Sequence, residues 1–146
     1  MIVPETEWLQ PDEFPDLRSY PEIGIDLETR DPDLKSKGSG AIIGNGEIVG
    51  IAVAVEGWSG YFPIAHGSGP NMDKKKVLSW FKDVCESPAD KVFHNAMYDV
   101  SWIRAQLGFN INGRIIDTMI AASLIDENRF QFTLNSCAWT WLNKGK

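Results

Sequence analysis

Two carboxylates stand near the end of one predicted strand. The segment 22–29 alternates apolar and polar residues as a buried strand does, with Asp26 and Glu28 two positions apart. Side chains two apart on a strand project from the same face, so these carboxylates are expected to lie together. A hard divalent cation such as Mg²⁺ or Mn²⁺ relieves their mutual repulsion, because it prefers carboxylate oxygen. The alternative interpretation, a strand end running into solvent, remains open because Asp-x-Glu is a common tripeptide.

A second polar cluster follows about seventy residues later, in the segment 94–99. A short strand is predicted to deliver Asn95, and a helix is predicted to carry Asp99 one turn further on. Positions four apart share a helix face, so both side chains are expected to point the same way. If this helix begins beside the end of the first strand, Asp99 joins Asp26 and Glu28 in one metal site. For Asn95, a helix-capping role is an alternative of nearly equal weight.

The elements that must position these residues follow from periodicity and breakers. The predicted order is three strands, helix, strand, helix, strand and two helices, with a long loop at 30–46 that could border a site. A hairpin followed by alternating helices and strands predicts an α/β fold with a mixed sheet flanked by helices. The predicted strands are 22–29, 48–55, 61–64, 91–94 and 114–116, and the predicted helices are 73–86, 95–107, 117–124 and 133–142.

Other polar residues are assigned structural roles. Asp117 lies at a strand–helix junction, where a helix N-cap is preferred to a fourth metal-binding carboxylate. His94 is interpreted as a packed or hydrogen-bonded strand residue, and His66 as a loop residue. The run 74–76 of three lysines is interpreted as the solvated face of its helix.

Composition narrows the functional class. The chain has 146 residues, a formal net charge of −6 and 43% hydrophobic residues, which predicts one folded domain. The acidic balance argues against broad binding of duplex nucleic acid but leaves open a narrow, metal-assisted site for a single-stranded end. Two cysteines without metal or disulfide spacing indicate a reduced, cytoplasmic setting. The sequence has no apolar run of membrane-spanning length.

The two polar segments resemble known motifs. Residues 26–29, Asp-Leu-Glu-Thr, resemble the first motif of the DEDD 3′–5′ exonucleases, and residues 95–99, Asn-Ala-Met-Tyr-Asp, resemble the second. Residues 116–119 and 133–139 resemble segments that follow in family A DNA polymerases of bacteria and phages. The resemblance spans roughly residues 20–146, and it implies an RNase H-like fold and a proofreading function in DNA replication.

The resemblance also implies a mechanism. Asp26, Glu28 and Asp99 would hold two Mg²⁺ or Mn²⁺ ions, one activating a water and the other stabilising the leaving 3′-oxygen. A nucleoside monophosphate would leave the 3′ end of single-stranded DNA. The residues implied to contact the substrate are Leu27, Thr29, Asn95 and Tyr98.

The sequence departs from the family at its C-terminal side. The third motif, an Asp preceded by Tyr four residues earlier or by His five residues earlier, is not found after Leu142. We therefore expect residues 1–21 to be an irregular lead-in and 22–146 to be the N-terminal part of an exonuclease domain, incomplete at its C-terminus. A downstream segment or a polymerase domain is the expected partner, in a bacterial or phage-infected cell. The alternatives are a catalytically silent binding module and an RNA-trimming exonuclease similar to RNase D.

Overall fold

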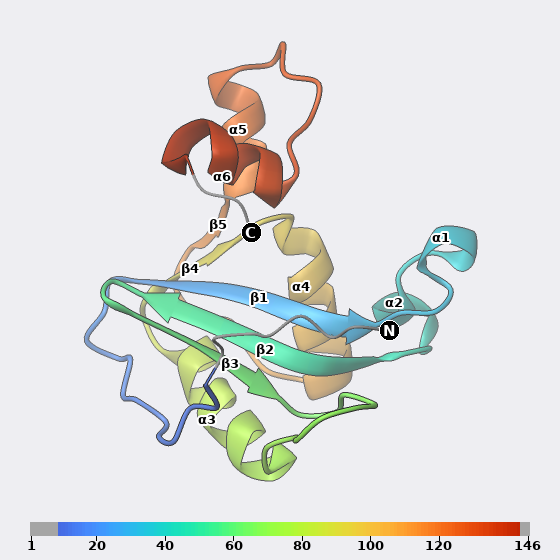
Figure 1. Ribbon diagram of the computed structural model, residues 1–146, viewed down its shortest axis with the longest axis vertical. Helices are drawn as coiled ribbons and strands as arrows, with labels where there is room; N and C mark the ends of the chain where they lie inside the picture. The colour runs from blue at the N-terminus through green and yellow to red at the C-terminus, as the bar shows by residue number, and fades with distance from the viewer. Residues whose placement is uncertain (1–8, 144–146) are drawn as a thin grey trace.

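The chain folds around one mixed sheet, which a computed structural model describes over residues 9–143 (Figure 1). Within these residues five strands lie in the order β3-β2-β1-β4-β5. The β1–β2 and β2–β3 pairs are antiparallel, and the β1–β4 and β4–β5 pairs are parallel. The predicted mixed α/β sheet is therefore confirmed. The strands are β1 (Glu22–Arg30), β2 (Glu47–Val55), β3 (Trp58–Pro63), β4 (Asp90–Phe93) and β5 (Ile115–Asp117).

The helices agree with the predicted order except in the loop after β1. This loop, predicted to be irregular, contains two single-turn helices, α1 and α2, because Asp31 and Gly44 close its turns. The remaining helices lie where periodicity places them, and Gly108 ends the π-helical segment in a left-handed conformation. The helices are α1 (Leu34–Lys37), α2 (Gly40–Ile43), α3 (Lys74–Glu86), α4 (Ala96–Trp102), the π-helical segment Ile103–Leu107, α5 (Thr118–Ile125) and α6 (Leu134–Leu142).

The β2–β3 hairpin is tighter than predicted. Strand β3 begins at Trp58 rather than Tyr61, so the turn shrinks to Glu56 and Gly57. Gly57 has φ +78°, a value that suits glycine in a two-residue hairpin turn. Strand β3 is the outermost strand on its side of the sheet, where Pro63, which has no N–H to donate, is tolerated.

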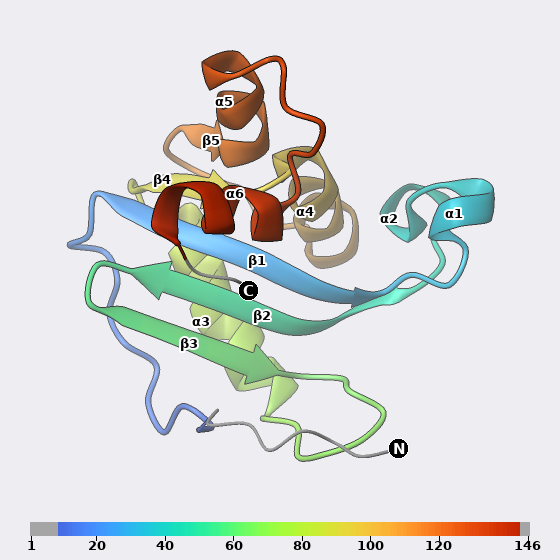
Figure 2. The ribbon, with the colours of Figure 1, turned by 45° about the horizontal axis from the view of Figure 1, so that its top comes forward.

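The two faces of β1 differ in chemistry. Ile23, Ile25 and Leu27 are buried in the core with residues of α3 and α4. Gly24, Asp26 and Glu28 alternate with them and so point to the opposite face. Figure 2 shows α3 behind the sheet and α6 in front of it, near β1. Strand alternation thus places the carboxylates on the less covered face.

An irregularity in strand pairing lies next to Glu28. Glu28 pairs with Gly50 and Thr29 pairs with Ile48, so Val49 is an extra residue on β2. The Ile48 N–H, displaced from the regular ladder, donates to the Gln106 side chain at 2.8 Å. A bulge bends its strand and increases the local twist, and bulges of this kind are common beside active sites.

Helix α3 closes the far face of the sheet. Its N-cap Asp73 accepts the N–H groups of Lys75 and Lys76, as its sequence predicts. Val77 and Phe81 are fully buried, and the three lysines at its start are exposed. Burial raises the pKa of the Cys85 thiol on this helix to about 12. Both cysteines are free and buried, in agreement with the absence of a predicted disulfide.

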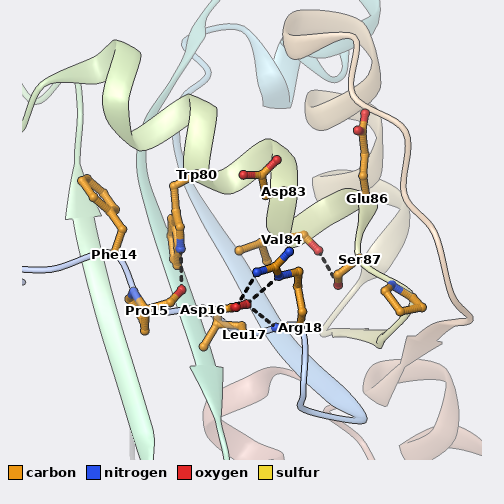
Figure 3. A pocket seen from close by; sticks show the side chains of 11 residues that line it. Phe14, Pro15, Asp16, Leu17, Arg18, Trp80, Asp83, Val84, Glu86 and Ser87 are labelled. Atoms are coloured by element: carbon orange, nitrogen blue, oxygen red, sulfur yellow. Dashed lines mark hydrogen bonds and ion pairs between the residues drawn. The ribbon is translucent and has the colours of Figure 1, made fainter.

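Part of the lead-in before β1 packs against α3. Phe14 stacks on Phe62 at 5.8 Å, and the Trp80 indole donates to the Pro15 carbonyl at 2.8 Å. A hollow of about 520 Å³ lies beside these contacts (Figure 3). The predicted catalytic residues do not line it.

Among the described helices, none is long and apolar enough to cross a membrane.

Candidate functional site

The buried carboxylate of Asp99 lies against the end of β1. Its Oδ1 accepts the Leu27 backbone N–H at 3.1 Å. Strand β4 pairs with β1 only as far as Gly24, so beyond that point no β4 residue is paired with β1. There the Asp99 carboxylate accepts the Leu27 N–H, and the residue is only 3% exposed. The structure thus places Asp99 beside Leu27 of the first strand.

The charge of Asp99 is coupled to that of its neighbours. Burial raises the pKa of Asp99 to about 7, and the negative charges of Asp26 and Asp117 raise it further, against the hydrogen bond from Leu27. The negative charge of Asp26 therefore lies close enough to Asp99 to raise the pKa of Asp99. Within residues 9–143, however, no three His, Cys, Asp or Glu side chains approach closely enough to hold a metal ion together. Joint coordination by Asp26, Glu28 and Asp99 remains a prediction.

Asn95 does not lie on the same helix face as Asp99. It precedes α4 in a left-handed conformation, with φ +69° and ψ +56°, and its side chain is exposed. The relation between positions four apart holds only inside a helix, so it does not apply to this pair. The capping alternative is also wrong, because the Asn95 side chain makes no capping hydrogen bond.

Asp117 supplies the cap that Asn95 does not. Its carboxylate accepts the N–H groups of Met119 and Ile120 in α5, which confirms the predicted N-cap. It also accepts the backbone N–H groups of Asn95 at 3.1 Å and Ala96 at 2.8 Å. Partial burial raises the pKa of Asp117, but the four backbone donors outweigh burial and hold the pKa below its usual value.

Tyr98 links the carboxylate strand to the loop after it. Its hydroxyl lies 2.7 Å from the Thr29 hydroxyl and donates to Asp31 at 3.1 Å. Both carboxylate oxygens of Asp31 in turn accept the Gly40 N–H. This chain of contacts fixes the loop beside the end of β1. Sequence reasoning missed Asp31, whose only local signal was the Asp-Pro breaker.

Leu27 offers little side-chain surface to a ligand. It is 6% exposed and packs in the core between the sheet and its helices. Its predicted contact with a terminal nucleotide can therefore involve only its backbone. Thr29, by contrast, is partly exposed.

His94 is hydrogen-bonded, as predicted, although it follows β4 rather than lying in it, and His66 lies in a loop, as predicted. His94 lies within hydrogen-bond distance of the Thr118 hydroxyl, at 2.9 Å, and of the Phe132 carbonyl, at 2.7 Å. These contacts tie the start of α5 and the segment before α6 to the end of β4. His66 contacts the Tyr61 hydroxyl, and its backbone exchanges two hydrogen bonds with the Asn71 side chain.

Tyr61 lies in the same cross-strand row as Asp26. The row runs from Asp26 through Ala52 to Tyr61. Burial raises the pKa of Tyr61 to about 12, and the charges of Glu28 and Asp26 raise it further. Sequence reasoning missed this neighbour, because the register of β3 against β2 is not visible in a single strand.

Small residues form an open groove on this face of the sheet. Its volume is about 1140 Å³, and Gly24, Ala52 and Ala54 lie along its floor. Leu134 and Leu142 of α6 line its other side. Asp26 is one of the residues that line the groove. Asp26 therefore lies at the border of an accessible, largely apolar surface.

Comparison with known proteins decides the family. A family model described as a 3′–5′ exonuclease of DNA polymerase A matches residues 5–144. The chain belongs to this family. The DNA-directed DNA polymerase of Pseudomonas phage M6 is 33% identical over 147 residues, which cover 97% of this chain and 22% of the polymerase. The chain thus spans about a fifth of that relative's length.

Solved structures show the same exonuclease fold. The POL domain of Pol1 from M. smegmatis, in complex with DNA primer-template and dNTP, has a TM-score of 0.60 at 17% identity, with coverage of 88% of this chain and 20% of that one. RNase D of Escherichia coli, an exoribonuclease involved in structured RNA processing, has a TM-score of 0.60 at 15% identity, with coverage of 88% and 30%. The predicted RNase H-like fold is confirmed by these similarities. Exonucleases of this family generally use divalent metal ions.

Proposed function

We propose that this exonuclease domain removes nucleotides from the 3′ end of single-stranded DNA, with Asp26, Glu28 and Asp99 as ligands of two Mg²⁺ or Mn²⁺ ions. The supporting observation is the buried Asp99 carboxylate, which lies on the Leu27 amide and is coupled in charge to Asp26. Carboxylates whose negative charges lie close together form a donor set that favours a divalent cation over protons. When bound, the metal ions would supply an activated water and stabilise the leaving oxygen.

The neighbouring residues have roles in holding the substrate. Thr29 and Tyr98 present adjacent hydroxyls beside the end of β1, suited to a sugar or phosphate oxygen. Asn95 is exposed at the start of α4 and can donate or accept a hydrogen bond. Leu27 contributes through its backbone. The loop held by Asp31 forms one border of the site.

We propose that a residue other than Asp117 supplies a fourth carboxylate. Asp117 is poorly suited to be this ligand, because both of its oxygens already accept backbone N–H groups. We assign residues 22–146 to the exonuclease domain, with residues 1–21 as its lead-in. A DNA polymerase domain or a downstream chain is the proposed partner, in a bacterial or phage-infected cell.

The acidic chain favours a single-stranded end over a duplex. A net charge of −6 opposes tracking along two phosphate backbones, whereas one splayed terminus can reach the metal ions. RNA remains the second candidate substrate, since the fold is shared with RNase D. A silent binding module is the third, and the retained Asp26, Glu28 and Asp99 argue against it.

The test is release of nucleoside monophosphates from 3′-labelled single strands of DNA and of RNA with Mg²⁺, using the chain joined to its downstream polypeptide. We expect metal-dependent release, faster on DNA, and its loss in Asp26→Ala. Asp83→Ala, which removes an exposed acid on α3, should retain full rate. Chelation by EDTA should abolish release. Equal rates of release by Asp26→Ala and by the unmodified chain would refute the proposed site. Residues 1–146 alone should release nucleotides only weakly.

A further inference from the structure

Two aspartates that cap helices in this chain differ in how many helices they bind. Asp73 accepts the N–H groups of Lys75 and Lys76, which both belong to its own helix, α3. Asp117 caps its own helix, α5, in the same way. In addition, its Oδ2 accepts the Ala96 N–H and its Oδ1 also accepts the Asn95 N–H, both at the start of α4. Asp117 therefore joins the beginnings of two helices through one carboxylate.

The start of α4 depends on this outside contact. Asn95 is held in a left-handed conformation that residues other than glycine adopt rarely, and its own side chain provides no cap. The first two N–H groups at this end, those of Asn95 and Ala96, are both taken by Asp117. Asp99 follows one turn later, with its carboxylate on the Leu27 amide.

We infer that Asp117 is a positioning residue for Asp99: by binding the start of α4 to the end of β5, it holds the Asp99 carboxylate on the Leu27 amide beside Asp26. A cap for α5 alone would need only Oδ1, which receives the Met119 and Ile120 N–H groups. The 2.8 Å bond from Ala96 to Oδ2 serves α4 alone. This inference rests on the proposed function, since it concerns the affinity of the Asp26 and Asp99 site for a divalent ion.

The first measurement is Mn²⁺ titration of the chain by calorimetry. Asp117→Ser retains a hydroxyl that can cap α5 but loses the second oxygen that binds α4. Asp73→Ser makes the same change at the single-helix cap. Partners that orient metal ligands typically change metal affinity about 10-fold to 100-fold, and we expect a loss of this size for Asp117→Ser. Asp73→Ser should bind Mn²⁺ as the unmodified chain does.

The second measurement separates positioning from loss of charge. The Leu27 amide resonance, followed by ¹H–¹⁵N NMR without metal, reports whether the Asp99 carboxylate still accepts its hydrogen bond. We expect this resonance to move and its hydrogen exchange to quicken in Asp117→Ser and Asp117→Asn, but not in Asp73→Ser. An unchanged Leu27 amide in a folded Asp117 variant would overturn the inference, even if Mn²⁺ binding weakened.

The remaining outcomes are also decisive. If the unmodified chain and Asp26→Ala bind Mn²⁺ equally, the proposed metal site fails, whereas the Leu27 amide still tests the positioning of Asp99. If the unmodified chain binds Mn²⁺ through Asp26 and Asp117→Ser binds it equally well, the inference alone fails. If both Asp117 variants are unfolded by circular dichroism, Asp117 is a determinant of the whole fold, and a specific positioning role is refuted.

Discussion

The two faces of the sheet carry opposite kinds of residue from the same strands. On the covered face, Ile25 pairs across the sheet with Val53, and both are buried under the helices. On the open face, Asp26 pairs with Ala52, and the floor is made of glycine and alanine. The covered face therefore supplies most of the burial of apolar surface, which is the main stabilising term in folding. The open face leaves space beside its carboxylates, which a binding site requires.

The largest expected effect lies on the covered face. Phe81 of α3 is fully buried in the core, so Phe81→Ala should reduce the free energy of unfolding by about 3–5 kcal/mol through lost burial and a cavity. On the open face, Tyr61→Phe removes one hydroxyl contact with His66 and should cost roughly 0.5–1.5 kcal/mol. Urea unfolding of both variants measures the difference. Similar losses in the two variants would contradict the division of roles between the faces.

An intermediate effect is expected where the open face is tightest. A Cβ at Gly50 would fall on the Tyr61 hydroxyl, whereas a Cβ at Gly24 would lie in ordinary contact, 3.6 Å from the Ala54 carbonyl oxygen. Gly50→Ala should therefore lose about 1–3 kcal/mol through overpacking. Gly24→Ala should be nearly neutral, because the position is extended and spacious. Thermal unfolding compares the two.

A double-mutant cycle sharpens the Gly50 prediction. If the ring of Tyr61 causes the loss, Gly50→Ala should be much less harmful in a Tyr61→Ala background. Interaction energies between residues in contact are of the order of 0.5–3 kcal/mol. Strictly additive losses would show that the strain at Gly50 comes from its backbone instead.

Over a single pH unit, the expected effect of the pH dependence contributed by Asp99 is no larger than the loss expected for Gly50→Ala. Its pKa is raised from 3.8 to about 7 in the folded chain, so the folded state binds more protons than the unfolded state between these values. Stability should therefore fall as pH rises from about 4 to about 7 and level off above that, by at most about 1.4 kcal/mol per pH unit. Asp99→Asn should lack this component. Urea unfolding at pH 6 and pH 7 provides the measurement.

The control for the pH experiment is Asp83→Asn, which alters an exposed acid on α3. It should keep the slope of the unmodified chain. The same slope in Asp99→Asn would assign the pH dependence to another group. Added Mn²⁺ should reduce the loss of stability near pH 7, because a bound cation favours the ionised carboxylate.

Local patterns in the sequence were sufficient for most elements. The alternation in 22–29 specified a strand and put Asp26 and Glu28 on one face, since side-chain direction has a period of two. Asp73, Asp117 and Thr133 marked helix starts, because their side chains reach N–H groups two or three residues ahead. These relations involve neighbours in sequence, so the chain determines them before it folds.

Relations between distant segments were decided only by the tertiary structure. The left-handed Asn95, the second pair of donors to Asp117 and the row from Asp26 to Tyr61 all depend on strand register and on how β4 and β5 end together. The start of α2 likewise depends on the contact of Asp31 with Gly40, nine residues away. Register and loop closure are set by the burial of whole faces, and a local window of sequence does not contain that information.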